Sequence, residues 1–367
     1  MTGVFCGMFS MLAALFANRI CSELSWNKAR ISCLAILLVS MLRNRTVNLV
    51  KLSAEASGGT TAESLYRRFQ NFFLKFAMPL EDVGKLVLSK LGKPADGWVL
   101  SMDRTNWKYG KVHINILAVG VVVNKVAVPI VWRVLPQSTK RGNSNTTHRI
   151  ELMKRLLRIL PAQDIRALTM DREFAGKEWL LWLDYKGVNF VARIRKNALV
   201  DGSPAGNRRH GNLLRSDKAK PVWGMALYFA GCRITGSNTR DEYLYVVSNR
   251  YHGKEATGLY KKRWGIEQVF SHFKKRGFDL ETTHMTDASK IEKLFAVITL
   301  AFLVSYGWGC QMKHEAPLNS TQKRKSIFRL GLDRIAQLFA NRTEFEEDIA
   351  ALAAWFSRPK YPSFFVV

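Results

Sequence analysis

Apolar residues within positions 1–95 recur every three or four residues, the period of a helix that is buried along one face. The clearest runs are Leu34, Leu37, Leu38, Met41 and Leu42 and, further on, Leu65, Phe69, Phe72 and Phe73. Residues 1–18 carry no charge, which is also a property of secretory signals. However, no Lys or Arg precedes the apolar run, and the run is short for a membrane span. We therefore expect a helical N-terminal region with a buried first helix.

From residue 97 onward the pattern changes to runs of β-branched residues. Three antiparallel strands are predicted first, and Asn124-Lys125 supplies a hairpin turn between the second and the third. The predicted elements are strands 98–102, 112–123 and 126–134, helix 149–160, strand 165–170, helix 177–184, strand 188–194 and a helix from about 254 to 276. This order is similar to that of RNase H-like folds. The expected class is therefore α/β with an RNase H-like core.

Two further regions lie outside this order of elements. Residues 195–252 are rich in Gly and Pro around two strand-like runs and predict a β-rich insertion. Residues 289–367 return to apolar positions at helical spacing, such as Ile291, Leu294 and Ile298. The expected organisation is a helical N-terminal region (1–95), a core (96–194 and 253–288), a β-rich insertion (195–252) and a helical C-terminal region (289–367).

The composition indicates which class of molecule the protein binds. The chain has 56 Lys and Arg against 29 Asp and Glu, a formal charge of +27, and each of the four regions is net positive. This favours a polyanion that contacts several parts of the fold, with nucleic acid ahead of an anionic membrane surface. A mean hydropathy of −0.08 argues against a polytopic membrane protein. The five cysteines form no zinc-type spacing, and we expect them to be reduced thiols in the core.

Two acidic residues follow predicted strands directly. Asp103 comes after 99–102, and Asp171 comes after 167–170. Side chains at strand ends can leave the core and enter a cleft. An Asp at such a position can equally begin a turn, so neither residue alone identifies a site.

The predicted helix at 254–276 gathers four polar residues on one face. At about 100° per residue, Tyr260, Arg263, Glu267 and Lys274 fall within a stripe about 60° wide. Ile266, Val269 and Phe273 form a separate apolar face that can pack on the sheet. Without further context, the stripe could be a solvated face on which Arg263 and Glu267 form an i,i+4 ion pair.

These residues carry a resemblance to a known family. Tyr260, Arg263, Glu267 and Lys274 have the Y-R-E-K spacing that marks insertion-sequence transposases of the DDE superfamily. Leu168-Thr169-Met170-Asp171-Arg172-Glu173-Phe174 resembles the segment with their second catalytic Asp, and Ser101-Met102-Asp103-Arg104-Thr105 resembles the first. The matches occur in the family's order, and the resemblance spans about 60 to 340.

The resemblance implies that Asp103, Asp171 and Glu267 are the catalytic triad and the metal ligands. Three carboxylates can hold two Mg²⁺ ions about 3.5–4 Å apart, with Mn²⁺ as a substitute, for two-metal cleavage of a phosphodiester. In similar transposases the Tyr, Arg and Lys of the motif bind a flipped-out nucleotide, a role that falls here on Tyr260, Arg263 and Lys274. An aromatic residue of the insertion stacks on the displaced base; Trp223 is the candidate, with Tyr243 or Tyr245 as alternatives.

The implied function is that of a cut-and-paste DNA transposase that binds terminal inverted repeats, cleaves through a hairpin and joins the ends to target DNA. The expected partners are double-stranded DNA and a second copy of the chain on DNA, joined through the C-terminal helices, with no membrane. Arg67 and Arg68 are candidates for backbone contacts. The resemblance also implies a cytoplasmic, nucleoid-associated bacterial protein. The alternatives are a catalytically silent DNA-binding protein derived from a transposase and a tyrosine recombinase with Tyr260 as nucleophile.

Overall fold

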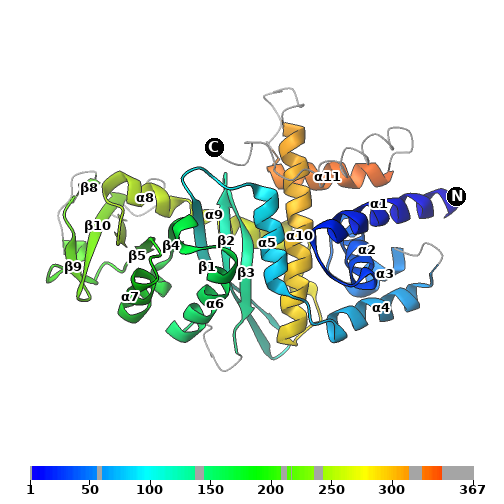
Figure 1. The fold of residues 1–367 in the computed structure, drawn as a ribbon, viewed down its shortest axis with the longest axis horizontal. Coiled ribbons are helices and arrows are strands. Elements are labelled where there is room, and N and C mark those ends of the chain that lie inside the picture. The colour runs from blue at the N-terminus through cyan, green and yellow to red at the C-terminus, as the bar shows by residue number, and fades with distance from the viewer. Residues whose placement is uncertain are drawn as a thin grey trace.

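The structure, a computed structural model, describes residues 2–55, 60–136, 144–207, 213–215, 217–234, 243–313 and 325–340. Parts of the predicted insertion and residues 341–367 of the predicted C-terminal region lie outside the described residues. The predicted α/β class is confirmed. A large mixed sheet occupies the middle of the molecule, and helices pack at one end of it (Figure 1).

The predicted helical N-terminal region is present as five helices. They are α1 (Thr2–Glu23), α2 (Lys28–Asn44), α3 (Leu49–Glu55), α4 (Ala62–Lys75) and α5 (Leu80–Leu91). The first four lie together on the far side of the long helix α10 (Ala288–Lys313), whereas α5 lies between α10 and the sheet (Figure 1). Lys90 of α5 is 1% exposed, and its ammonium lies 2.6 Å from the carboxylate of Glu23 on α1. This buried ion pair ties the two parts of the region together.

Local sequence explains where α4 begins and which face it buries. Thr61 is the N-cap, and its hydroxyl accepts a hydrogen bond of 3.2 Å from the backbone N–H of Ser64. The predicted apolar positions Leu65, Phe69, Phe72 and Phe73 are all buried. The ammonium of Lys293 on α10 donates a 2.8 Å hydrogen bond to the carbonyl of Phe73. Because this carbonyl has no partner within α4, Lys293 fixes the end of the helix.

The central sheet has the order β3-β2-β1-β4-β5-β11-β10-β8, and β9 pairs with β10. The first three strands are antiparallel, as predicted, and Asn124 supplies the positive φ of 53° in the β2–β3 turn. Strands β1, β4 and β5 are parallel, with α6 and α7 between them in the chain. The bounds are β1 Trp98–Tyr109, β2 Val112–Val123, β3 Val126–Val134, α6 Thr146–Ile159, β4 Ile165–Met170, α7 Lys177–Tyr185 and β5 Phe190–Arg193.

The prediction that Asp103 ends a strand is wrong. β1 continues to Tyr109, and Asp103 pairs with Ala118 of β2 inside the strand. Only the parallel pairing with β4 ends here, because its last register pair is Met102 with Met170. Beyond that point β1 alternates between buried and exposed residues and keeps β2 as its partner. Asp103 therefore lies where β1 stops pairing with β4 and continues to pair with β2 alone.

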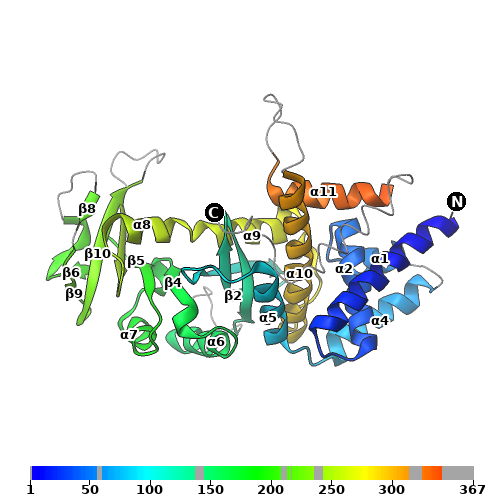
Figure 2. The same cartoon turned by 45° about the horizontal axis from the view of Figure 1, so that its top comes forward.

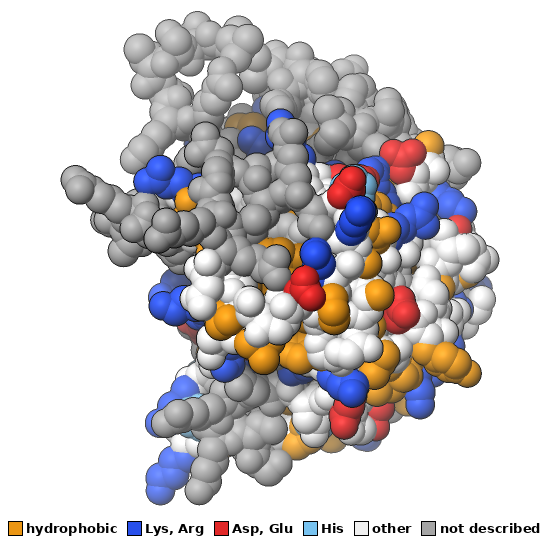
Figure 3. All heavy atoms as spheres, turned by 90° about the vertical axis from the view of Figure 1, so that its left-hand side faces the viewer, with side chains coloured by type: hydrophobic (Ala, Val, Ile, Leu, Met, Phe, Trp, Pro, Cys, Tyr) orange, Lys and Arg blue, Asp and Glu red, His pale blue; other side chains and the backbone are white. Residues whose placement is uncertain are grey.

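Described strands of residues 195–252 extend the central sheet. β11 (Tyr243–Ser248) pairs antiparallel with β5, and β10 (Met225–Arg233) pairs with β11. The smaller elements are β6 (Leu199–Val200), β7 (Ser203–Pro204), β8 (Leu213–Arg215) and β9 (Lys220–Val222). On the face of the molecule at this end, Lys and Arg side chains are scattered among acidic and apolar ones (Figure 3).

The long helix predicted at 254–276 is present but interrupted. It consists of α8 (Gly253–Lys261), α9 (Trp264–Ser271) and a π-helical turn (His272–Arg276), which run end to end from the insertion toward α10 (Figure 2). At the junction, Arg263 N–H donates to the carbonyl of Tyr260, and Ile266 N–H donates to that of Arg263. These contacts span three residues instead of four, so the helix tightens locally.

The C-terminal helices complete the core. α10 is long and apolar enough to cross a membrane, but 94% of its apolar window is buried inside the protein, as in the core helix of a soluble protein. α11 (Ile327–Ala340) crosses it where Gly309 and Gly331 allow backbone contact. Cys33, Cys232 and Cys310 are buried thiols outside any disulfide, as expected. Cys21 is exposed because it lies beside the buried stripe of α1, and the side chain of Cys6 lies outside those that the structure describes.

Candidate active site

Three parallel strands bring charged side chains to one edge of the fold. Met102, Met170 and Ala192 are register partners across β1, β4 and β5, and the next residues are Asp103, Asp171 and Arg193. Ligand sites in α/β sheets occupy the carboxyl ends of such strands. The register alone therefore places two carboxylates and a guanidinium side by side.

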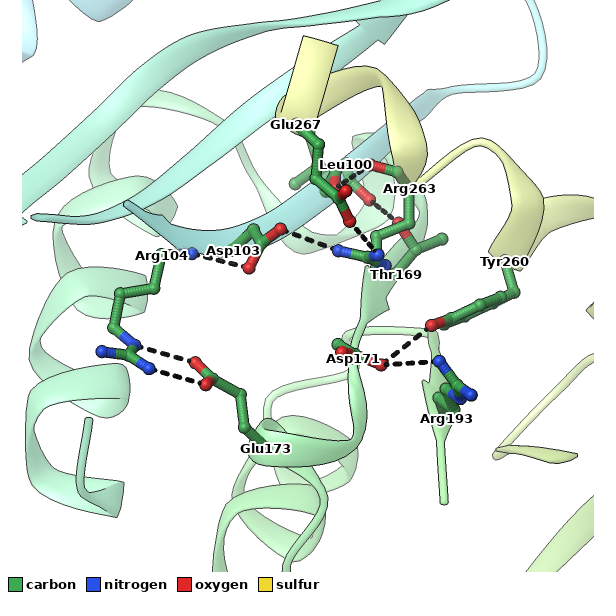
Figure 4. A network of polar contacts seen from close by, with 11 residues as sticks. Leu100, Asp103, Arg104, Thr169, Asp171, Glu173, Arg193, Tyr260, Arg263 and Glu267 are labelled. Carbon is green, nitrogen blue, oxygen red and sulfur yellow. Dashed lines mark hydrogen bonds and ion pairs between the residues drawn. The ribbon is translucent and has the colours of Figure 1, made fainter. Parts of the chain in front are cut away.

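The helical junction between α8 and α9 completes this cluster. The guanidinium of Arg263 lies 2.7 Å from Oδ2 of Asp103 and also bonds to Oε1 of Glu267 (Figure 4). Arg263 is only 8% exposed. The catalytic carboxylates predicted on β1 and on the helix are thus brought together, with a buried cation between them.

Tyr260 connects the same helix to the remaining carboxylate. Its hydroxyl donates a 3.0 Å hydrogen bond to Oδ1 of Asp171, which also lies 3.7 Å from the guanidinium of Arg193 (Figure 4). Burial raises the pKa of Tyr260 to about 12. A phenol that is buried, protonated and bonded to a carboxylate is a poor nucleophile. The geometry therefore argues against a tyrosine recombinase.

Burial governs the electrostatics of Asp103. It raises the pKa of this carboxyl to about 6, against the opposing effects of Arg263 and the backbone N–H of Arg104. That N–H donates a 2.7 Å hydrogen bond to Oδ1. Burial works against the charge of Arg263 too, but the neighbouring Tyr260 and acidic groups raise its pKa overall. Arg263 is therefore held as a cation inside the cluster.

Two tertiary contacts place the junction over the sheet. The hydroxyl of Ser101 on β1 donates a buried 3.1 Å hydrogen bond to the carbonyl of Arg263. Gly265 lies so close to β3 that a Cβ there would come within 2.8 Å of the Val126 carbonyl carbon. The predicted apolar face of Ile266, Val269 and Phe273 is fully buried. A residue larger than Gly at 265 would push the helix, and Glu267 with it, away from the sheet.

Lys274 does not join the carboxylate cluster. It lies in the π-helical turn, where its ammonium bonds to the carbonyl of Asn106, lies 3.0 Å from Glu281, and approaches the Trp107 ring at 6.0 Å. Asn106 and Trp107 lie further along β1 than Asp103, and Glu281 lies in the turn at residues 280–282. Lys274 therefore places a cation beyond the carboxylates, toward the C-terminal end of β1.

Three residues near the cluster escaped the sequence prediction. The guanidinium of Arg104 forms two hydrogen bonds, of 2.9 and 3.0 Å, with the carboxylate of Glu173 (Figure 4). This pair joins the segments that follow Asp103 and Asp171. Trp264, one turn before Glu267, is 57% exposed. The ion pair could have been suspected from the sequence, because Arg104 directly follows Asp103 and Glu173 comes two residues after Asp171. Nothing in the sequence indicated that Trp264 is exposed.

The other predicted binding residues lie away from the carboxylates. Trp223 occupies the β9–β10 turn at φ 52°, a strained conformation for a bulky side chain. Tyr243 and Tyr245 stack at 6.1 Å on β11, and Tyr245 is buried. Arg67 and Arg68 lie on exposed α4, where Arg67 pairs with Glu63 and Arg68 bonds to the hydroxyl of Ser32.

The donor set suits a hard cation, although the described residues contain no group of three Asp, Glu, His or Cys side chains spaced to hold a metal. Carboxylate oxygens are the ligands that Mg²⁺ and Mn²⁺ prefer. A cation already lies between Asp103 and Glu267 in the form of the Arg263 guanidinium. Asp103, Asp171 and Glu267 therefore fit a divalent metal chemically, provided that Arg263 moves aside.

Comparison with protein families agrees with this geometry. The transposase DDE domain matches residues 96–304, which is more than half of the chain and includes Asp103, Asp171 and Glu267. A search of curated proteins gives no match. Members of this family bind DNA and generally use divalent metal ions. The carboxylates on β1, β4 and α9 thus lie inside the matched domain, and the chain belongs to the family of DDE transposases.

Proposed function

We propose that this protein is a cut-and-paste transposase with Asp103, Asp171 and Glu267 as its catalytic residues. It binds terminal inverted repeats, nicks one strand by hydrolysis, forms a hairpin by transesterification and joins the ends to target DNA. One observation carries the proposal: carboxylates from β1, β4 and α9 converge on Arg263 and Tyr260. A purely structural salt bridge would not require all three half-buried carboxylates around one buried Arg and Tyr.

In the DNA-free chain, Arg263 and Tyr260 keep the carboxylates engaged with protein groups. Arg263 neutralises Asp103 and Glu267, and Tyr260 donates to Asp171. A DNA phosphate is a competing anion for the guanidinium. We propose that Arg263 turns from the carboxylates to the phosphate when DNA binds, which frees Asp103 and Glu267 as ligands. Asp103, Asp171 and Glu267 would hold the divalent metal, which would supply activation of the attacking water or 3′-hydroxyl and stabilisation of the leaving oxygen.

In this proposal the remaining cations and aromatic side chains contact the DNA on either side of the scissile bond. Lys274 suits a phosphate further along β1, because it sits beside Asn106 and Trp107. For a displaced base we keep Trp223 as a candidate, supported by its strained backbone, which is more common at functional sites. Trp264 is a second candidate, since it is exposed on the helix that carries Glu267. Tyr245 is a weaker one, because it is buried.

The partners follow from the same proposal. Terminal-repeat DNA is bound by the N-terminal helices, with Arg67 and Arg68 on exposed α4 available to backbone phosphates. Two ends are paired by a homodimer that forms on DNA through the C-terminal helices. The protein acts on chromosomal DNA in the cytoplasm.

The test uses purified full-length protein and labelled duplexes that contain the inverted repeats flanking the coding region. With Mg²⁺ or Mn²⁺ we expect nicked and hairpin products, and none with EDTA. Asp171→Asn should abolish both products while repeat binding persists. Lys154→Gln, an exposed change on α6, should be active. Binding without cleavage in either metal would instead identify a silent DNA-binding protein, and cleavage by Asp171→Asn would contradict the assigned residues.

A further inference from the structure

The outer face of α4 carries long polar side chains that the fold does not use. Arg67, Gln70, Asn71 and Leu74 fall within a stripe about 100° wide, opposite the buried phenylalanines. All four are exposed, and Leu74 is 60% exposed. Among the described residues, the side chains of Gln70 and Asn71 have no hydrogen-bond partner. A folded helix therefore presents one apolar and three polar groups to an outside ligand.

Hollows on both sides make α4 a ridge. A hollow of about 690 Å³ lies between α4 and the start of α2 and is lined by Asn27, Arg30 and Arg68. A second, of about 560 Å³, lies between α4, α3 and the segment 282–290. Arg67 and Asn71 line both. A ridge formed by one helix has the shape that enters the major groove of B-DNA, which is about 12 Å wide.

The charges around the ridge favour a polyanion. Lys28, Lys51 and Lys75 are exposed on α2, α3 and α4, and Arg30 and Lys290 line the two hollows. Among the side chains that the structure describes, two acids lie nearby: Glu63, which pairs with Arg67, and Asp287 in the second hollow. The cations outnumber them. Phosphate backbones on either side of a groove would therefore meet net positive surface while the ridge faces the bases.

The side chains on the ridge match base edges. Asn and Gln form paired hydrogen bonds with N6 and N7 of adenine, Arg does so with guanine, and an apolar side chain contacts the methyl group of thymine. Gln70, Asn71, Arg67 and Leu74 supply each type within two helical turns. The unpartnered amides of Gln70 and Asn71 are the groups that would gain most from such contacts.

The second hollow leads from the ridge to the catalytic strand. Its lining includes His284, whose ring stacks on Tyr109 at 5.2 Å. Tyr109 ends β1, six residues after Asp103, or about 20 Å along an extended strand. Lys274 lies between these points, beside Asn106. A duplex seated on α4 and passing over the hollow would run along β1 toward the carboxylates, and this part of the strand alone spans about six base pairs at about 3.4 Å each.

We propose that α4 is the recognition helix for the terminal repeat, with Gln70 and Asn71 reading bases in the major groove more than about six base pairs from the cleavage site. This inference rests on the proposed function, because it takes the element's own ends as the ligand. It assigns sequence specificity to a surface that lies outside the catalytic domain match.

The test measures binding by fluorescence anisotropy in EDTA, so that cleavage does not interfere. The probes are a duplex of the flanking inverted repeat and a scrambled duplex of equal length. Gln70→Ala and Asn71→Ala should each weaken repeat binding roughly 5- to 150-fold and leave scrambled binding unchanged. Lys51→Ala should weaken binding of the repeat and of the scrambled duplex equally. It should also reduce the magnitude of the slope of log K against log salt concentration by about one, because one phosphate contact is lost. Circular dichroism melting should show all three variants folded, since these side chains are exposed.

The outcomes separate the two proposals. If the unaltered protein does not prefer the repeat over the scrambled duplex, the proposed function fails. If it prefers the repeat and Gln70→Ala and Asn71→Ala keep that preference, the recognition role of α4 is wrong. Substituting repeat positions one at a time should locate the positions to which each variant is insensitive. Positions within about six base pairs of the cleavage site would contradict the proposed path along β1.

Discussion

The catalytic centre and the outer face of α4 are both polar, but their side chains are in opposite states. In the centre, Arg263 is 8% exposed, and it and Tyr260 are bonded to the three carboxylates. On α4, Gln70 and Asn71 are exposed and unpartnered among the described residues. Gln70 and Asn71 can therefore bind DNA without breaking internal contacts, whereas the centre must exchange its own ion pairs for contacts with DNA and metal.

This difference suggests an order of events. Exchanging a buried ion pair is costly unless a new partner replaces the old one, because each charge would be left without compensation. Contacts made by α4 require no such exchange, so they can form first and hold a phosphate near Arg263. Binding of the repeat by α4 would then help Arg263 to exchange Asp103 and Glu267 for a DNA phosphate. Such coupling would restrict cleavage to DNA that the N-terminal helices have already selected.

The largest effect expected is on catalysis alone. Glu267→Gln removes a proposed metal ligand and should lower the rate of cleavage by roughly a thousandfold or more, since bound metal contributes several kcal/mol to the transition state. Binding of the repeat should change little, because α4 is untouched. Single-turnover cleavage and anisotropy, measured on the same preparation, separate the two. A parallel loss of binding and cleavage would show that the two regions are not independent.

The next effect concerns the cation inside the centre. Arg263→Gln leaves Asp103 and Glu267 facing each other without compensation and should lower the free energy of unfolding by about 3 kcal/mol. Added Ca²⁺ or Mn²⁺ should restore part of this loss in the absence of DNA, because a divalent ion can take the place of the guanidinium. Denaturant unfolding with and without metal measures both.

A second ion pair, between β3 and α6, provides a matched control. Arg133 of β3 pairs with Glu151 of α6, but both side chains are partly exposed. Arg133→Gln should cost about 1 kcal/mol or less and gain nothing from metal. If Arg263→Gln behaves in the same way, Arg263 does not hold the position of a metal ion.

Much of this centre was predictable from local pattern. The β2–β3 hairpin, the strand before Asp171 and the Tyr260, Arg263 and Glu267 stripe all follow from hydrophobic period and spacing, and the structure has them. The predicted catalytic and DNA-binding roles remain predictions. Sequence could not show that Arg263 bridges Asp103 and Glu267, because that contact joins segments 160 residues apart.

Two errors have physical causes that local pattern does not contain. β1 was predicted too short because residues 104–109 are mostly polar, and they form a strand only through pairing with β2. The break between α8 and α9 has no proline to mark it. It occurs where Ser101 bonds to the Arg263 carbonyl and Gly265 meets β3, which are tertiary contacts. The face of α4 was noted for its arginines, but its amides became candidates only once their exposure was known.

A smaller effect should distinguish the two regions by pH. His272, after α9, is packed against Phe302 and Phe328, and burial together with Arg276 lowers its pKa to about 4. The unfolded chain, with an ordinary His pKa, binds the proton more readily. The contribution of His272 to the free energy of unfolding should therefore fall as the pH drops below about 6.5, by about 2 kcal/mol at pH 5. Asp103 acts in the opposite direction, because burial raises its pKa to about 6 and the folded chain then binds that proton more readily than the unfolded chain.

His272→Leu tests this assignment. Between pH 6.5 and 5 the unfolding free energy of the variant should fall less than that of the unaltered protein, or rise through the contribution of Asp103, as measured by urea unfolding at each pH. The buried face of α4 contains no titratable side chain, so Phe69→Leu should shift the whole curve without changing its slope. An equal slope in His272→Leu and the unaltered protein would mean that other groups set the acid sensitivity.

The smallest effect concerns the one exposed tryptophan beside the carboxylates. If Trp264 stacks on a displaced base, Trp264→Ala should weaken binding of the pre-nicked repeat by about 1 kcal/mol, the low end for base stacking because the ring is only partly covered. Trp264→Phe should keep most of the affinity, and Tyr185→Ala, which removes another exposed aromatic group, should have no effect. A 2-aminopurine next to the scissile bond reports the base directly: stacking quenches its fluorescence, and Trp264→Ala should restore it. If Trp223→Ala restores the signal instead, the base is held by the insertion, and the catalytic centre contributes charge alone.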